Sequence, residues 1–459
     1  MYNEDTIAAI STAQGAAGIG IVRISGKDAF RVASTIYRGR KPFCDLGDHT
    51  IIYGRIIDPK SGDMLDEALV SKMGEPATFT GEDVVEINCH GGVVMVNRVL
   101  ELVLKNGARL AEPGEFTKRA FLNGKMDLSQ AEAVIDIINS KTEQSSKAAV
   151  AQLEGKLSKR VGKAKARLID ELAHIEVTLD YPEYDIEKVT EENVKRALLE
   201  VKSMLTKIIR IFERGRIIRE GISAIIVGRP NVGKSSLLNE LTGKNKAIVT
   251  DIPGTTRDIL EEYININGIA VRLLDTAGLR ETQDVVEKIG VEKAQKAIEQ
   301  SDLVIMIIDG QSGLTDEDKD ILQMLTDKKV IVLINKVDIL DEQKISKIEK
   351  QLKSYKPVRT SMVDGAGIEE LEQKVESLFF KGELKENDEI LITNIRHKKL
   401  IDSAIASIDE ALLGILSKMP LDCITIDIKD AAEYLGEITG ESISEDVMHN
   451  IFSRFCIGK

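Results

Sequence analysis

The first part of the chain alternates short apolar runs with one helical stretch. Segments 19–24 and 84–87 have the apolar character of β-strands, and segment 93–105 has apolar positions at helical spacing. Strands and helices mixed in this way are typical of an α+β domain. We therefore predict an α+β domain over residues 1–120.

A helical period follows, from about residue 121 to residue 217. Its clearest part has apolar residues spaced as on one helix face: Leu128, Ala131, Val134, Ile135 and Ile138. The stretch 180–185 contains a proline and clustered acids, which is typical of a connection between two helices. The sequence thus predicts long helices over 121–217, the first part of a helical domain.

A third pattern begins near residue 218. Helical lengths of chain separate four apolar runs that have the length and composition of buried strands: 222–227, 271–274, 303–308 and 330–334. Strands that alternate with helices form a doubly wound, mostly parallel sheet. We predict such an α/β domain over residues 218–382.

The pattern becomes helical again after a polar joint at 381–388. The α/β domain is therefore inserted between two helical segments, 121–217 and 383–459, which can pack together as one domain. The predicted fold class is multidomain, with an N-terminal α+β domain, a split helical domain and an inserted α/β domain.

Composition and charge narrow the class of protein. With 459 residues, 43% of them hydrophobic and 30% charged, the chain is expected to be a soluble globular protein of about three domains. The net charge of −13 argues against binding nucleic acid through the overall field, and leaves a local basic patch open. The sequence contains no run of about 20 apolar residues, so no membrane span is predicted. The four cysteines form no C-x-x-C pair, which favours a reducing cytoplasm: Cys44, Cys89, Cys423 and Cys456.

The strongest motif is a phosphate-binding loop. Residues 228–235, G-R-P-N-V-G-K-S, match G-x-x-x-x-G-K-S and lie between a predicted strand and a predicted helix. Glycines let backbone N–H groups wrap the phosphates at the helix N-terminus. In this pattern Lys234 reaches the β- and γ-phosphates and Ser235 holds Mg²⁺. The loop predicts a nucleoside triphosphate site.

Two further motifs follow in the order that a GTP site requires. D-T-A-G at 275–278 follows a predicted strand, so Asp275 is expected in the magnesium shell and the Gly278 N–H at the γ-phosphate. N-K-V-D at 335–338 closes another strand. The Asp338 carboxylate can accept two hydrogen bonds from guanine N–H groups, a donor pair that adenine lacks. The three motifs together predict GTP.

The residue that orients the attacking water is not evident from these motifs. G-T-T-R-D at 254–258 has the threonines of the first mobile switch of GTPases. Leu279 stands where Ras-type enzymes carry a glutamine, and an apolar side chain cannot polarise water. Either hydrolysis is very slow or another residue acts, and Glu281, Asp284 and Glu287 are candidates. Each acid is also explained by the favourable dipole at the start of the next helix.

Several segments together resemble a known family. They are the phosphate loop, T-D-I-P-G-T-T-R-D at 250–258, D-T-A-G-L-R-E from 275, G-I-G-I-V-R-I-S-G at 18–26, and F-C-I-G-K at 455–459. They look like the tRNA modification GTPases of the MnmE (TrmE) family. The likeness spans Asp5 to Lys459, and the terminal C-I-G-K with an inserted GTPase domain is highly specific.

The resemblance implies a potassium-dependent GTPase that acts on tRNA. The protein would be a cytoplasmic homodimer with a folate-binding, dimerising N-terminal domain, and its partner would be an FAD-dependent protein of the MnmG/GidA type, which holds the FAD. A tetrahydrofolate in the 5,10-methylene or 5-formyl form would supply the carbon. The product would be an aminomethyl or carboxymethylaminomethyl group at C5 of the wobble uridine, U34. The tRNA would bind mainly through the complex, with ammonium and glycine both open as nitrogen sources.

The resemblance also implies roles for individual residues. Potassium would be held by Asn231, Thr250, Ile252 and Thr255, and magnesium by Ser235 and Thr256. Glu287 would be the water-orienting acid and Lys234 a second catalytic group. The expected GTP-binding residues are Asn231, Val232, Gly233, Lys234, Ser235, Ser236, Thr250, Asp251, Ile252, Pro253, Gly254, Thr255, Thr256, Asp275, Thr276, Ala277, Gly278, Asn335, Lys336, Asp338, Ser361 and Met362.

A folate site is the other part of this resemblance. Its expected contacts are Arg23, Glu86, Lys125 and Lys459. A carboxylate suits the amine-rich edge of a pterin, and cationic side chains suit the carbonyl and carboxylates of the cofactor. Cys456 is expected to face this site, where it is either a nucleophile or a small buried hydrophobic residue.

One segment departs from the family pattern. T-S-M-V-D-G at 360–365 occupies the last guanine motif, where Ser-Ala is usual, and Met362 replaces the small residue. The usual contact there is a backbone N–H to guanine O6, which Met362 also offers. The change is expected to affect packing, not the choice of base.

Two other classes of function fit part of this pattern. A ribosome-assembly GTPase of the Era or Der kind would dock on RNA, but only one GTPase domain is expected and the C-terminal region lacks the basic G-x-x-G module of KH domains. A folate-binding scaffold with an inactive GTPase domain would explain Leu279. The intact Lys234, Ser235, Asp275 and Asp338 argue against it.

Overall fold

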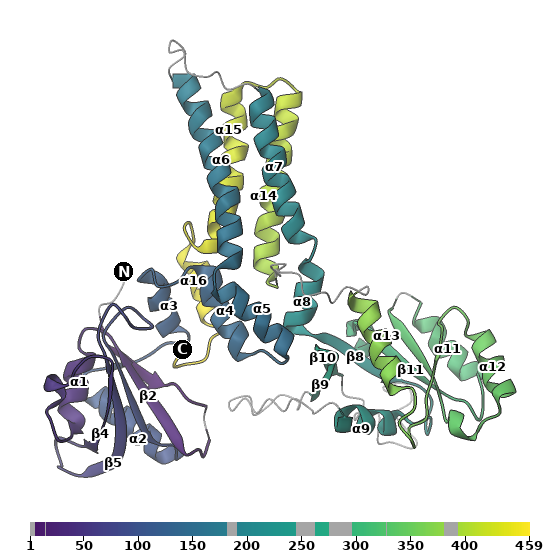
Figure 1. The fold of residues 1–459 in the computed structure, drawn as a ribbon, viewed down its shortest axis with the longest axis horizontal. Helices are drawn as coiled ribbons and strands as arrows, with labels where there is room; N and C mark the ends of the chain where they lie inside the picture. Colours follow the sequence, from purple (N-terminus) through teal and green to yellow (C-terminus); the bar gives the residue numbers. More distant parts are fainter. Residues whose placement is uncertain are drawn as a thin grey trace.

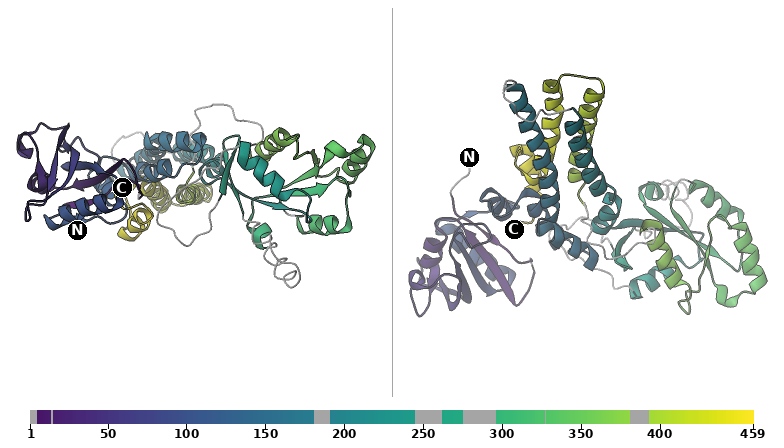
Figure 2. Two further views of the ribbon diagram at one scale, coloured as in Figure 1. Left: turned by 90° about the horizontal axis from the view of Figure 1, so that it is seen from below. Right: turned by 45° about the horizontal axis from the view of Figure 1, so that its top comes forward.

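The parts of the chain stand side by side in the computed structural model (Figure 1). An N-terminal α+β domain lies at one end, a tall helical domain stands in the middle, and an α/β domain lies at the other end, as two further views also show (Figure 2). The structure describes residues 5–13, 15–180, 191–244, 262–274, 296–326, 328–380 and 393–459. The fold class predicted from the sequence is confirmed.

The N-terminal domain is built on a mainly antiparallel sheet with the strand order β3-β4-β5-β6-β2-β1-β7. Its strands are β1 (Ile7–Ile10), β2 (Ile19–Ser25), β3 (Tyr37–Arg38), β4 (Thr50–Ile57), β5 (Met64–Met73), β6 (Val84–His90) and β7 (Arg109–Leu110). Along β2, Val22 and Ile24 are buried while Arg23 between them is half-buried on the other face. This alternation follows from the two-residue period of a strand.

Helices α1 (Ala29–Ile36) and α2 (Val93–Lys105) cover one face of this sheet. The strands expected at 19–24 and 84–87 and the helix expected at 93–105 are confirmed. A short turn η1 (Phe43–Asp45) and helix α3 (Glu115–Leu122) complete the domain. The sheet face away from α1 and α2 carries Arg23 and Glu86, which are direct partners across β2 and β6.

The helical domain joins segments that are far apart in the sequence (Figure 1). Its helices are α4 (Leu128–Ile138), α5 (Glu143–Leu153), α6 (Lys156–Asp180), α7 (Glu191–Ile209), α8 (Phe212–Glu220), α14 (Ile395–Leu416), α15 (Leu421–Thr439) and α16 (Glu445–Phe452). Leu168, Leu198, Ile408 and Ile428 belong to one buried core, shared by α6, α7, α14 and α15. The expectation that the two helical segments pack together is therefore confirmed. None of the described helices is both long and apolar enough to cross a membrane.

The α/β domain has the strand order β13-β12-β11-β8-β10-β9, with all pairs parallel except β9 and β10. The strands are β8 (Ile222–Val227), β9 (Glu262–Ile266), β10 (Ile269–Leu273), β11 (Leu303–Asp309), β12 (Val330–Asn335) and β13 (Val358–Arg359). The other elements are α9 (Lys234–Lys244), α11 (Asp316–Met324), η3 (Val337–Ile339), α12 (Glu342–Gln351) and α13 (Ile368–Phe380). Residues 303–308 of β11 are all buried, as expected for the centre of a sheet covered on both faces.

The end of the chain returns to the N-terminal domain. The Ser11 hydroxyl donates a hydrogen bond of 3.1 Å to the Gly458 carbonyl, 447 residues away. Gly458 has φ +97°, and a Cβ atom there would lie 2.1 Å from the Ile10 carbonyl oxygen. Only glycine fits this approach without a backbone shift, so the terminal segment is seated by its backbone against β1.

Candidate functional site

The phosphate-binding loop connects β8 to the first turn of α9. Gly228 has φ +149° and its added Cβ would lie 2.5 Å from the Ile307 carbonyl oxygen, so the loop passes close to β11. Asn231 has φ +64°, which is uncommon for a residue other than glycine. Ser235 and Ser236 are exposed in the first turn of α9. The N–H groups of that turn have no acceptors earlier in the helix, so they are suited to an anion.

Lys234 is curled over the loop that precedes it. Its Nζ donates hydrogen bonds of 2.6 Å to the Gly228 carbonyl and 2.7 Å to the Arg229 carbonyl. Burial lowers the pKa of the Lys234 ammonium below its ordinary value. A phosphate anion would favour the charged form, because a nearby negative charge offsets the cost of burial.

Asn335 ties the phosphate-binding loop to the strand that carries the base motif. Its Nδ2 donates a 2.8 Å hydrogen bond to the Val232 carbonyl, and its Oδ1 is buried without a hydrogen-bond partner among the described residues. A Cβ on Gly233 would lie 2.3 Å from Asn335 Nδ2. The second loop glycine is therefore needed by this contact, and the two motifs meet at one place.

We expect Asn335→Ala to weaken nucleotide binding by up to about tenfold, because one buried hydrogen bond contributes about 0.5–1.5 kcal/mol. Titration with a fluorescent GDP analogue would measure the affinity. Asn97→Ala is a matched control, since the Asn97 amide makes a bond of the same length, 2.8 Å, to the Val93 carbonyl in the N-terminal domain. Unchanged affinity in the Asn335 variant would remove this contact from the binding site.

The base end of the site is formed by residues after β12 and β13. Asp338 lies exposed on η3. The Val337 N–H donates a hydrogen bond of 3.2 Å to the Thr360 carbonyl, and this bond joins the two base segments. Ser361 is buried. Met362 is half-buried against the core of the α/β domain, within 4.0 Å of the Cβ position at Gly233.

The residues expected at a folate site include a close ion pair. Arg23 Nη2 lies 2.8 Å from Glu86 Oε1, and the Arg23 guanidinium lies 5.6 Å from the centre of the Phe116 ring. Burial, followed by the charge of Arg23, lowers the pKa of Lys459, while Glu86 and Cys456 act in the opposite direction. The structure thus brings the terminal segment into the electrostatic environment of the Arg23–Glu86 pair.

Two other residues of this set differ in their surroundings. Cys456 is exposed, so it is not the small buried hydrophobic residue that was one alternative. Lys125 Nζ donates a hydrogen bond of 2.9 Å to the carbonyl of Pro76, which lies in the segment before β6.

Comparison with known proteins identifies the family. A family model described as the MnmE helical domain matches residues 128–456, and one described as the N-terminus of GTP-binding protein TrmE matches residues 6–125. The tRNA modification GTPase MnmE of Acetivibrio thermocellus is 64% identical over 459 residues, which cover 100% of both chains. The chain belongs to the MnmE family of tRNA modification GTPases.

Other MnmE proteins match over the same extent. Those of Alkaliphilus oremlandii and Geobacillus thermodenitrificans are 48% and 50% identical, and each match covers 100% of both chains. The solved structure of an Aquifex aeolicus Era variant bound to GDP·AlF4⁻ is 33% identical over 41% of this chain and 66% of that chain, with a TM-score of 0.28.

The site residues of this MnmE-family chain fall into two groups. The structure describes the phosphate-binding loop, the two base segments and the folate set. The others lie outside the described residues and stay predictions: Thr250, Asp251, Ile252, Pro253, Gly254, Thr255, Thr256, Asp275, Thr276, Ala277, Gly278 and Glu287.

Sequence reasoning missed two ion pairs that support the MnmE nucleotide site. Arg229 Nε lies 3.1 Å from Asp318 Oδ1, and Asp318 is fully buried under the loop. Lys336 Nζ lies 2.7 Å from Asp309 Oδ2. Burial raises the pKa of Asp309, but the hydrogen bonds from Lys336 and the Gln311 N–H, together with the charges of Lys336 and Arg229, outweigh burial and lower the pKa below its ordinary value. The phosphate loop is thus fixed to a carboxylate in the first turn of α11, and the base motif to a carboxylate at the end of β11.

Sequence reasoning also missed a buried charge cluster in the MnmE helical domain. Glu132 of α4 accepts hydrogen bonds of 2.6 Å from His397 Nε2 and 2.8 Å from Arg396 Nη2, at the start of α14. One turn further along α4, Asp136 pairs with Arg219 of α8 at 2.8 Å. Helix α8 leads into the α/β domain and α14 follows it, so the charge cluster holds both connections of that domain.

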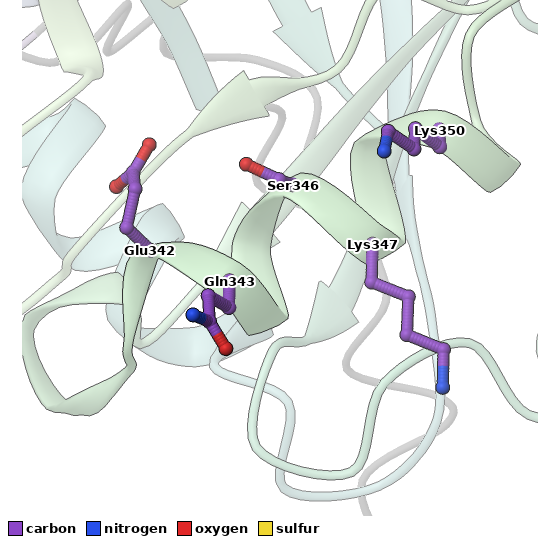
Figure 3. A pocket seen from close by; sticks show the side chains of 5 residues that line it. All are labelled: Glu342, Gln343, Ser346, Lys347 and Lys350. Carbon is purple, nitrogen blue, oxygen red and sulfur yellow. The ribbon is translucent and has the colours of Figure 1, made fainter.

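A shallow hollow of about 390 Å³ lies over α12, away from these motifs (Figure 3). Its side chains all come from one helix, with Glu342 and Ser346 pointing to one side and Lys347 to the other. It contains none of the predicted GTP-binding residues.

Proposed function

We propose that this protein hydrolyses GTP in a potassium-dependent reaction that is coupled to the modification of C5 of the wobble uridine, U34, in tRNA. The observation that carries the GTP part is the hydrogen bond from Asn335 to the Val232 carbonyl, because it joins the base motif to the phosphate loop. The Lys234 ammonium, held over the loop by the Gly228 carbonyl, supplies a cation where the phosphates would bind.

Residues of the phosphate-binding loop and of the segment 250–256 would hold the magnesium and potassium ions. Ser235 and Thr256 would bind Mg²⁺, and Asn231, Thr250, Ile252 and Thr255 would bind K⁺. Oxygen ligands suit both ions. The potassium ion would offset the charge that develops on the transferring phosphoryl group. Glu287 would orient the water, since Leu279 cannot.

The one-carbon unit would come from a tetrahydrofolate bound by the N-terminal domain of a homodimer. The Arg23–Glu86 pair supports this, because a carboxylate and a guanidinium at one place can meet both donors and acceptors of a pterin. Lys125 and Lys459 would bind the cofactor's acidic groups. Cys456 is exposed and accessible to reagents in solution, as a nucleophile must be.

The FAD-dependent partner, of the MnmG/GidA type, would supply much of the tRNA contact. A net charge of −13 makes tight binding of tRNA by this chain alone unfavourable. The domain boundaries proposed are residues 1–120, 121–217, 218–382 and 383–459, and the proposed compartment is the cytoplasm.

The test is the steady-state rate of GTP hydrolysis in potassium and in sodium at matched ionic strength, which removes general screening as an explanation. We expect hydrolysis to be faster in potassium by about tenfold or more, equivalent to at least about 1.4 kcal/mol in the barrier. Equal, slow rates in the two salts would contradict the potassium mechanism while leaving GTP binding intact.

A further inference from the structure

The first half of α6 has a charge pattern unlike the rest of the chain. Residues 156–167, K-L-S-K-R-V-G-K-A-K-A-R, contain six Lys or Arg side chains and no Asp or Glu, in a protein whose net charge is −13. The first half of α6 therefore carries positive charge without an acid in the same run.

Four of these cations form one surface, which we name the α6 basic stripe: Lys156, Lys159, Arg160 and Lys163. Spacings of three and four residues put them on the same side of the helix. All four are exposed, whereas Leu157, Val161 and Ala164 of the same turns are buried in the core of the bundle. The stripe covers two turns of α6.

Little negative charge faces the stripe. Lys156 Nζ lies 3.4 Å from a carboxylate oxygen of the exposed Glu154. Lys159 Nζ donates a hydrogen bond of 3.5 Å to the Glu154 backbone carbonyl. Arg160 and Lys163 have no ion pair with any residue that the structure describes. The two further cations of the run, by contrast, are paired: Lys165 with Glu441, and Arg167 with Glu171. The stripe is the part of the run that remains open to solvent.

Helix stability does not explain this arrangement. Cations in the first turns of a helix oppose its dipole, and like charges four residues apart, as in Lys156/Arg160 and Lys159/Lys163, repel each other. Helix α12 shows the usual arrangement, with Glu342 in its first turn and Lys350 in its last. An anionic partner would turn the unfavourable charges of α6 into favourable contacts.

The stripe lies close in the structure to the terminal segment. Ser158, inside the stripe, is hydrogen-bonded at 2.9 Å to Ser129 in the first turn of α4. The neighbouring Leu128 belongs to a small buried cluster with Phe455, and Cys456 follows directly. The start of α4 thus contacts the stripe on one side and shares a buried cluster with the terminal segment on the other.

We propose that the α6 basic stripe binds the phosphate backbone of tRNA next to the uridine that is modified. This inference rests on the proposed function, because that uridine must reach the one-carbon unit beside Cys456 and Lys459. RNA is favoured over an acidic protein since the exposed positions of the stripe are all cationic, whereas the centres of protein interfaces are enriched in aromatic residues and depleted in lysine.

The experiment compares two quadruple variants of the full-length protein. K156Q/K159Q/R160Q/K163Q neutralises the stripe, and K344Q/K347Q/K350Q/K353Q removes the same charge from four exposed lysines on and after α12. The probe is an unmodified tRNA transcript with uridine at position 34. Affinity is measured at several salt concentrations, with and without the flavoprotein, and GTP hydrolysis is measured as a check on the folded state.

We expect the stripe variant to bind tRNA about tenfold more weakly or worse at low salt. The slope of log affinity against log salt should fall in magnitude by about three, since each lost phosphate contact removes about 0.7–0.9. The α12 variant should bind as the wild type does, and both should hydrolyse GTP at the wild-type rate.

Three results would overturn the inference, and they can be told apart. Equal loss in both variants would show a general charge effect. Loss of flavoprotein binding with unchanged tRNA affinity would make the stripe a protein interface. Failure of the wild type to bind tRNA at any salt, even with the flavoprotein, would overturn the proposed function and the role of the stripe with it.

Discussion

Replacing Glu287 by alanine should lower the GTP hydrolysis rate by about 10²- to 10⁴-fold, the usual contribution of a positioned acid–base group, and leave GTP affinity nearly unchanged. The reason is chemical. Leu279 stands in the sequence where Ras-type enzymes carry the water-orienting glutamine, and an apolar side chain cannot polarise water. The resemblance to the family implies Glu287 as the acid that performs this task. Single-turnover hydrolysis and nucleotide titration on the same preparation would separate the two effects.

Two further variants serve as comparisons for Glu287→Ala. Glu281→Ala removes a neighbouring acid and should keep most of the activity. Lys234→Ala should lose nucleotide binding as well as hydrolysis, because Lys234 is expected to contact the phosphates themselves. Turnover in the Glu287 variant at the wild-type rate would exclude Glu287 from the mechanism.

The largest effect on stability should come from Glu132→Ala. The Glu132 carboxylate is buried between His397 and Arg396, at 2.6 and 2.8 Å. Removing one partner from a buried charge pair leaves the others uncompensated, which costs about 3–5 kcal/mol of unfolding free energy. We expect a lower urea midpoint for the helical signal in circular dichroism. Glu143→Ala is the control, since its pair with Lys147 is exposed and should matter little.

The same cluster predicts how stability depends on pH. Burial raises the pKa of Glu132, but the charge and hydrogen bond of His397, with those of Arg396, outweigh burial and hold the pKa at about 2. A depressed pKa stabilises the fold above the unfolded value, near 4.5, and this contribution is lost as the pH falls from 4.5 towards 2. For Asp136, burial outweighs Arg219 and raises the pKa, so its contribution has the opposite sign. The Glu132→Gln variant should lose the part of the acid dependence that Glu132 contributes, so its stability should fall less steeply between these pH values than that of the wild type.

Local patterns were sufficient for the elements that a short window defines. The strand at 222–227 and the helix at 93–105 have the predicted bounds. Their apolar spacing lies within each element, and the residues that end each element follow it directly in the sequence. Pairing between distant strands was not predictable in this way. Ile7 of β1 lies opposite Arg109 of β7, and no local signal marks two residues so far apart in the chain.

The candidate site shows the same division. Lys234, Asn335 and Asp338 belong to motifs with a known spacing, so the sequence was enough to propose their chemistry. Asp318 and His397 act through partners far along the chain, and no motif contains them. For Glu132 there was a signal: it lies four residues after Leu128, on the apolar face of its helix, where an acid is expected only if it is paired.

The return of the terminal segment to β1 sets an order of events during synthesis. Gly458 is made 447 residues after Ser11, which at about 5–20 residues per second means a delay of roughly 20–90 s. Through that interval the nascent N-terminal sheet can form, but the Arg23–Glu86 pair has no Lys459 beside it. The chemistry proposed for this corner therefore depends on residues that are translated long after the sheet they pack against. A nascent chain stalled within the α/β domain would lack part of the proposed folate site.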